Sequence, residues 1–296
     1  MTRVYASNRI KEEDMNYTRL FFGLILTLAL SLGAMVFNVY AQDDVKAKMK
    51  SDKTGTNPVN FQRESRLYNE YSWLNTEGDG DQDVTTFEFR TPFANGRWQF
   101  RMRARYNILT ADFNDDGVND VDESGFGDMD VRFITVPYLK GTNAIALGLE
   151  AFFDTASENT LGSGSTSLGP QIFYAKFFRG GFGPYKGGGM FAPGLQYKFS
   201  VHEAAGRDKI DQILIDLNFL MMGTSKKFWF FTDPQIVIDN ETDKAFCICD
   251  LEFGMMMTTW YEDLKGHSVY IRPSFGVGGD RPTDGSVEVG YKIVGW

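Results

Sequence analysis

The feature that most constrains the fold of this chain is an unbroken alternation of apolar and polar residues between Arg97 and Ile108. Trp98, Phe100 and their alternate neighbours form one face, and the other face is polar and rich in arginine. A period of two over a dozen residues predicts a β-strand, longer than the strands usual in soluble proteins. A strand that crosses a membrane at a tilt near 45° needs about 9–11 residues. The segment therefore has the length of a membrane-spanning strand.

The same alternation recurs along the chain. An Asn-Gly pair at residues 95–96 joins the segment 97–109 to another alternating segment, which is a strong hairpin signal. An even strand number is expected of a single-chain bacterial barrel, and we count twelve. The predicted strands lie at 62–74, 84–93, 97–109, 127–138, 144–154, 166–178, 188–200, 210–222, 228–239, 245–259, 267–276 and 285–296.

Composition agrees with an all-β, transmembrane antiparallel β-barrel. Aromatic residues make up 15% of the chain and the mean hydropathy is −0.28, too low for a helical membrane protein. Both values suit a chain whose apolar residues occupy every second position. The alternative is a soluble secreted β-sandwich, which would be built from shorter strands.

The connections and the C-terminus support the barrel. If the chain enters the barrel from the periplasm, the external connections include 75–83, 110–126, 155–165, 201–209 and 277–284. Most internal turns are shorter, as expected of such barrels. The last segment alternates and ends in Trp296, which resembles the signal that the barrel-assembly machinery reads, although Trp296 lies on the opposite face from the apolar row.

Residues 1–41 have the pattern of a secretory signal peptide. Arg19 supplies a positive charge, residues 20–37 form an apolar run, and Val39 and Ala41 are small residues at the positions that a signal peptidase recognises. The alternative is a retained transmembrane anchor, because the run is near the lower length limit for a membrane span.

Cleavage is predicted before Gln42, and Met15 is the predicted start of translation. The acidic residues 12–14 are foreign to the first part of a signal peptide, which is usually basic. Residues 42–60 are then a periplasmic N-terminal segment, and residues 61–296 form the barrel.

An acidic segment at residues 112–123 matches the calcium-loop pattern D-x-[DN]-x-[DN]-G-x5-E. Ca²⁺ prefers about 6–8 oxygen ligands, and Gly117 permits the tight turn that such a loop needs. Predicted strands rather than helices flank the segment, so the alternative is a solvated acidic loop. The predicted Ca²⁺ ligands are Asp112, Asn114, Asp116, the carbonyl of Val118, Asp120 and Glu123.

The arginines of the segment 97–109 are predicted to face the lumen, because the apolar residues between them must face lipid. Neighbouring strands place acidic and basic residues on the same inward face. These charges nearly balance, which favours a salt-bridged plug of the lumen. The alternative is a charged constriction that selects anionic solutes. The predicted lumen residues are Glu88, Arg90, Arg101, Arg103, Arg105, Asp128, Asp130 and Arg132.

Three segments, taken in order, resemble a known family. They are GFGDMDVR at 125–132, FDTAS followed by LGSGS and LGP within 153–170, and FTDPQ followed by LEFG within 231–254. Together they resemble the "MetA-pathway of phenol degradation" family of outer-membrane β-barrel proteins, often called the "transporter" family. The resemblance covers about 125–255. It implies a barrel that takes up small hydrophobic compounds.

Other classes of function have little support. A net charge of −9 argues against a nucleic-acid partner. The two histidines, His202 and His267, have no assignable orienting residue, although Ser268 adjoins one of them, so we predict no enzyme. Cys247 and Cys249 are predicted to be small apolar residues on the membrane face; a metal or redox role is the alternative.

The sequence therefore predicts a bacterial outer-membrane barrel for passive passage or binding of small hydrophobic or aromatic solutes. The alternative is a structural or interaction barrel with a calcium-ordered external loop and a plugged lumen. Expected partners are outer-membrane lipid and lipopolysaccharide, the barrel-assembly machinery and a small-molecule solute.

Overall fold

A computed structural model of the chain describes residue 54 and residues 56–76, 78–112, 118–181 and 183–295. The strands are β1 (Glu64–Leu74), β2 (Gly80–Phe93), β3 (Trp98–Ala111), β4 (Val121–Phe126), β5 (Met129–Lys140), β6 (Asn143–Phe153), β7 (Ser165–Phe178), β8 (Gly189–Glu203), β9 (Asp211–Met222), β10 (Phe228–Asp239), β11 (Lys244–Met256), β12 (His267–Val277) and β13 (Thr283–Val294). Two short 3₁₀ helices, η2 (Asn159–Leu161) and η3 (Met257–Thr259), lie in connections. The predicted signal peptide lies outside the described residues.

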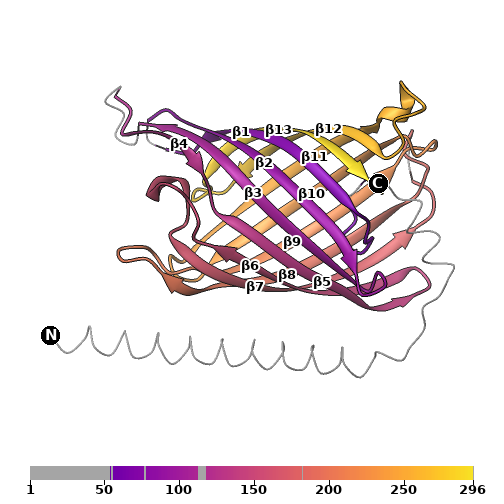
Figure 1. The fold of residues 1–296 in the computed structure, drawn as a ribbon, viewed down its shortest axis with the longest axis horizontal. Coiled ribbons are helices and arrows are strands. Elements are labelled where there is room, and N and C mark those ends of the chain that lie inside the picture. Colours follow the sequence, from indigo (N-terminus) through magenta and orange to yellow (C-terminus); the bar gives the residue numbers. More distant parts are fainter. Residues whose placement is uncertain (1–53, 55, 77, 113–117, 182, 296) are drawn as a thin grey trace. The chain divides into compact units, whose positions relative to one another are not determined.

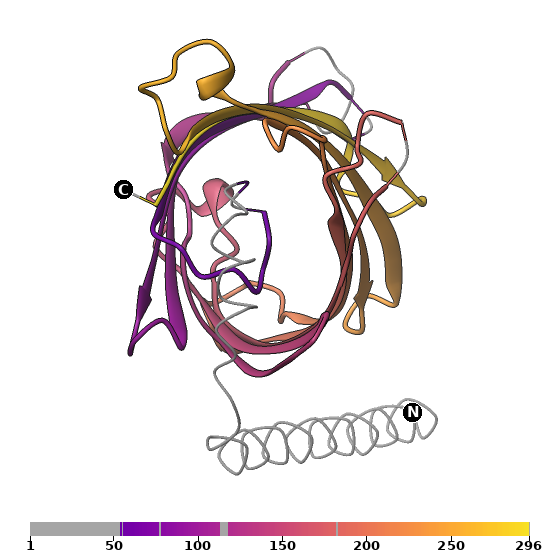
Figure 2. The same cartoon turned by 90° about the vertical axis from the view of Figure 1, so that its right-hand side faces the viewer.

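The strands form one antiparallel sheet. The sheet closes on itself because β1, the first strand, pairs with β13, the last, as well as with β2. β4 and β5 pair with successive stretches of β3, so the two together occupy one position in the wall. The fold is a closed, twelve-stranded antiparallel barrel, as predicted. Figure 1 shows the strands tilted relative to the long direction of the barrel, and Figure 2 shows the ring that they form.

Most strand positions agree with the predicted ones. β2 begins at Gly80, four residues before the predicted start, and larger differences lie around the third and fourth predicted strands. The connection predicted at 110–126 is shorter, because β3 continues to Ala111 and β4 begins at Val121. Gly127 interrupts the β4–β5 strand; its N–H bonds the carbonyl of Arg105 at 3.0 Å. A Cβ at Gly127 would collide with the Asn107 side chain, so the bend needs glycine there.

The two faces of the wall differ as the alternation predicts. Exposed apolar side chains such as Leu67, Phe87 and Ile271 lie on the outer face. Buried polar side chains such as Glu88 and Asp130 lie on the inner face. This is the inverse of a soluble protein and is the arrangement of a barrel whose outer face contacts lipid.

The N-terminal segment lies inside the barrel. Thr54 and residues 56–63, here called the N-terminal plug, precede β1, and Figure 2 shows their trace within the ring. Val59 is fully buried in an apolar cluster with Ile134, Trp229 and other inner-wall residues. The boundary predicted at residue 61 therefore falls within a segment that packs against the barrel. The prediction missed this because the segment has no periodicity to mark it.

The inner wall is apolar where the N-terminal plug packs and polar elsewhere. The apolar part comes from one end of several strands, including Ala144 at the start of β6 and Met190 at the start of β8. Connections at that same end are short at 94–97, 141–142 and 223–227 and longer at 179–188 and 257–266, so most but not all of them follow the predicted asymmetry. No helix among the described residues is long and apolar enough to cross a membrane.

Candidate functional site

The arginine row of β3 converges on one carboxylate. Antiparallel pairing sets Arg103 directly opposite Asp130 of β5, so both side chains point into the barrel. Asp130 lies 2.9 Å from Arg103 Nε, 3.1 Å from Arg101 Nη2 and 2.6 Å from Arg105 Nη2. Asp130 is fully buried, and three guanidinium groups surround it. The inward direction predicted for these arginines agrees with their placement.

Glu150 of β6 extends this network. Its carboxylate pairs with Arg101 and lies 3.1 Å from Arg103 Nη2. Gln196 of β8 donates a hydrogen bond to its other oxygen at 3.3 Å. Glu150 was not among the predicted lumen residues, although its position in an alternating segment places it on an inward face.

A second ion-paired group lies on β1 and β2. Glu88 lies 2.6 Å from Arg90 Nε and 3.3 Å from Arg66 Nε. Arg66 also pairs with Glu64, which lies 3.7 Å from Arg90 Nη1. The two networks line one side of the lumen, and we call this side the arginine wall: Arg66, Arg90, Arg101, Arg103, Arg105 and Arg132 with Glu64, Glu88, Asp130 and Glu150.

Two predicted lumen residues stand apart from the pairing. Arg132 is only 8% exposed, yet no described residue forms a hydrogen bond or ion pair with it. Asp128 lies in the break between β4 and β5 and accepts backbone N–H bonds from Thr155 at 3.1 Å and Ser163 at 2.7 Å. The Asp128 carboxylate therefore holds the 154–164 connection in place, while its main-chain carbonyl accepts a hydrogen bond from Arg105 Nη1 at 2.7 Å.

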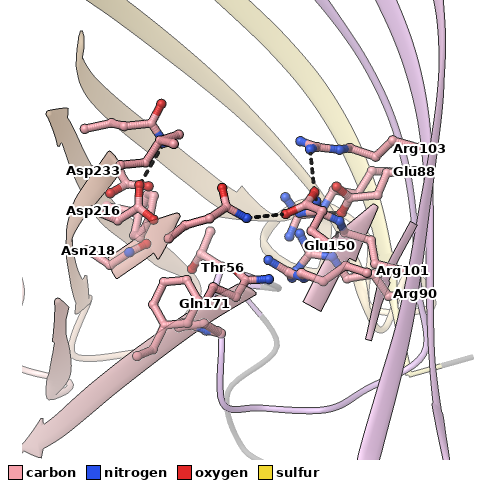
Figure 3. A pocket seen from close by; sticks show the side chains of 18 of the residues that line it. Thr56, Glu88, Arg90, Arg101, Arg103, Glu150, Gln171, Asp216, Asn218 and Asp233 are labelled. Atoms are coloured by element: carbon pink, nitrogen blue, oxygen red, sulfur yellow. Dashed lines mark hydrogen bonds and ion pairs between the residues drawn. The ribbon is translucent and has the colours of Figure 1, made fainter. Parts of the chain in front are cut away.

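The facing side of the lumen carries three acids that form no ion pair with a described residue. Asp216 of β9, Asp233 of β10 and Asp250 of β11 share the inward face, and Asp233 lies directly opposite Asp250 in the register. Gln235 donates a hydrogen bond to Asp216 at 2.8 Å. Figure 3 shows Asp216 and Asp233 across the cavity from the arginines. We call these three acids the carboxylate wall.

Between the two walls lies a cavity of about 380 Å³. Its lining is mostly charged or amide side chains, with a few aromatic rings such as Phe152 and Phe173. Thr56 and Pro58 of the N-terminal plug form part of its boundary. The cavity has the size of a binding site for one small molecule.

A buried lysine fixes the N-terminal plug. Lys292 of β13 is fully buried, and its Nζ lies 2.9 Å from Glu252 and donates to the carbonyl of Thr54 at 3.3 Å. Trp229 Nε1 donates to the same Glu252 at 2.7 Å. Gly254 leaves room for the Trp229 ring, because a Cβ at position 254 would overlap that ring. The plug is thus held by a satisfied ionic group as well as by apolar packing.

The turn in the plug has a sequence cause. Asn57-Pro58-Val59-Asn60 forms a β-turn, with Asn60 N–H bonded to Asn57 O at 3.2 Å and Val59 N–H bonded to Asn57 Oδ1 at 3.0 Å. Proline suits the second position of such a turn, and asparagine its first. This Asn-Pro pair was the available sign that the segment is ordered.

The predicted calcium loop is described only in part, because Asn114 and Asp116 lie outside the described residues. Asp112 is buried and Val118 and Asp120 are exposed, whereas Glu123 lies in β4, where Thr160 Oγ1 donates to its carboxylate. No group of three or more His, Cys, Asp or Glu is placed to hold a metal within the described ranges. Calcium binding stays a prediction.

Replacing Glu123 with Gln tests it, because Glu123 would be the bidentate ligand. Titration of the native protein with Ca²⁺ should release or absorb heat, and Ca²⁺ should protect residues 110–126 from protease. Both effects should vanish in Glu123→Gln and persist in Glu158→Gln, an exposed neighbour. A native titration without heat up to about 10 mM would exclude a weak extracellular-type site.

The remaining candidate residues are not assembled into a site. His267 contacts Tyr291 on the outer face, whereas Ser268 is fully buried on the inner face, so they do not form a pair. The Sγ atoms of Cys247 and Cys249 lie 3.6 Å apart, and both cysteines lie on the outer face.

Comparisons with known proteins support the fold. No family model matches the chain, and no curated protein does. The resemblance to the phenol-degradation family therefore stays a prediction. Among solved structures, the chain is similar to the COG4313 outer membrane channel from Pseudomonas putida F1, with a TM-score of 0.60 and 9% identity over 80% of this chain and 96% of the other.

More distant similarities also concern outer-membrane barrels. The NanC porin matches with a TM-score of 0.49 and 12% identity over 78% of this chain and 98% of the porin. Phospholipase A from the Escherichia coli outer membrane matches with a TM-score of 0.39 and 10% identity over 82% of this chain and 96% of the other. With its apolar outer face and closed sheet, the chain has the fold of a bacterial outer-membrane β-barrel.

Proposed function

We propose that this barrel is a passive channel for small polar or charged solutes, which the N-terminal plug keeps closed at rest. The observation that carries the proposal is the cavity between the arginine wall and the carboxylate wall. A barrel that served only as a scaffold would gain stability by filling this space with apolar side chains. Burying many charges around an open space is unfavourable unless that space is used.

The lining bears on the class of solute. The sequence resemblance implied hydrophobic or aromatic compounds, and the aromatic rings at the cavity are few compared with its guanidinium, carboxylate and amide groups. A pathway of this polarity favours solutes that replace their hydration with hydrogen bonds and ion pairs. We therefore favour polar solutes over the aromatic ones first expected.

A structural or interaction barrel is the second candidate. It is favoured by the buried Lys292–Glu252 pair and by the apolar cluster around Val59, which together hold the plug against the inner wall. In such a barrel the plug would stay in place permanently.

Recordings in planar lipid bilayers separate the two candidates. We expect the purified native protein to produce discrete current steps, brief because the plug must leave for each opening. Heat-modifiable migration on gels serves as the control that the protein is folded. The channel proposal would be contradicted if the folded native protein produced no current steps and the plug variant Val59→Asp, described below, produced none either.

A further inference from the structure

The two walls of the lumen carry opposite net charge. In the arginine wall, six guanidinium groups outnumber four carboxylates. The carboxylate wall has three acids. Of the basic side chains on the strands that flank it, Arg272 of β12 already pairs with Glu252 and Glu288, and Lys198 of β8 lies over the Phe152 ring. An electric field therefore crosses the cavity, directed from β2, β3 and β5 towards β9, β10 and β11.

Each wall also presents a charged side chain with a buried atom that forms no hydrogen bond to a described residue, although the other side of the Asp233 carboxylate accepts the Leu217 backbone N–H. Arg132 lines the cavity, is 8% exposed and has no partner within the described ranges. On the facing wall, Asp233 Oδ1 is buried and accepts no hydrogen bond from a described residue. Almost all buried polar groups in native proteins are paired, so an exception calls for an explanation such as a ligand or water.

These two unpaired groups are opposite in sign and line one cavity. A cation alone would satisfy Asp233 and leave Arg132 unpaired, and an anion alone would do the reverse. A molecule with both charges satisfies both walls. The guanidinium group of arginine suits a carboxylate, which it can bind through two parallel hydrogen bonds. Carboxylates with amide neighbours suit an ammonium group, which only donates.

We propose that this cavity binds a small zwitterion, with its carboxylate at Arg132 and its ammonium at Asp233 and Asp216. The site rests on the proposed channel function and gives it a solute class. The cavity volume of about 380 Å³ limits the ligand to a small molecule. Gln171, which also lines the cavity and has an unpaired side-chain nitrogen, supplies a further donor for the carboxylate.

Calorimetry on the folded protein tests the site without requiring an open channel. The probes are ω-amino acids of increasing chain length, each compared with the carboxylic acid and the amine of the same length. We expect one length of amino acid to bind at least about tenfold more tightly than either singly charged analogue, because it alone reaches both walls. Equal affinity for all three kinds of probe, or no binding of any, would overturn the proposal.

Single substitutions test which residue binds the carboxylate of the ligand and which binds its ammonium group. Arg132→Gln should lose the preference for the amino acid over the amine, and Asp233→Asn should lose the preference over the carboxylic acid. Both variants should fold, since Arg132 forms no ion pair with a described residue and Asp233→Asn keeps a side-chain oxygen that can accept the Leu217 backbone N–H. Arg281→Gln, in the exposed β12–β13 connection, is the control and should bind like the native protein.

Bilayer recordings separate failure of the site from failure of the channel. Current steps combined with no zwitterion preference would refute the site and leave the channel standing. Zwitterion binding without current steps in any variant would support the site and refute the channel.

Discussion

Asp130→Asn should lower the free energy of unfolding of the barrel by about 3–5 kcal/mol, the range for breaking a buried charge pair from one side. Asp130 is fully buried and neutralises Arg101, Arg103 and Arg105. An asparagine fits the space, but it leaves Arg101 and Arg103 with Glu150 and removes the ion pair that the structure describes for Arg105. Urea titration of the protein refolded in lipid vesicles measures the loss.

Two controls define this result. Asp154→Asn, at an exposed position, should change the unfolding free energy by no more than about 0.5 kcal/mol. Arg132→Gln, one alternate position beyond Asp130 on the same inward face, should cause no loss, because Arg132 has no partner among the described residues. A loss below about 1 kcal/mol in Asp130→Asn would mean that the network stabilises the barrel no more than an exposed salt bridge does.

Val59→Asp should open the channel. Val59 is fully buried among apolar side chains, and Lys292, which lies over the Trp229 ring of that cluster, is already paired with Glu252. If burial of this charge costs the plug about 3 kcal/mol, the ratio of closed to open barrels falls by about a hundredfold. Bilayer recordings should then show long openings in place of brief ones.

The barrel wall itself should survive Val59→Asp, because the strand ladder closes without the plug. Heat-modifiable gel migration should therefore match that of the native protein. Val118→Asp makes the same substitution at a site that is 67% exposed, and its openings should resemble those of the native protein. Unchanged brief openings in a folded Val59→Asp variant would show that the plug does not control conduction.

Strand positions could be predicted from sequence because alternation is a local property. Residues such as Phe100 and Arg101 are assigned to opposite faces by their own neighbours, and the closed sheet confirms these assignments. The break at Gly127 could not be seen this way, because it depends on a close approach of Asn107 from another strand. The bonds between the Asp128 carboxylate and the 154–164 connection could not be predicted from alternation either, because they join separate parts of the sequence.

The two walls and the plug depend on contacts between distant parts of the sequence. Alternation places Asp233 inward, but only barrel closure determines that it faces the arginines of β3 across the lumen. Thr54 and Val59 belong to a segment without periodicity, and their positions follow from packing against strands far along the chain. The charged residues of the lumen could therefore be predicted from the sequence, but their division between the arginine wall and the carboxylate wall could not.

The Lys292–Thr54 contact also orders the events of assembly. The two residues are 238 positions apart, and Lys292 belongs to the strand that completes the ring by pairing with β1. Before β13 joins β1, the pocket for the N-terminal plug lacks one of its sides, and the Thr54 carbonyl has no lysine to bind. Sealing of the lumen can therefore be completed only when the last strand is in place, so a barrel that stalls short of closure would be an unsealed pore.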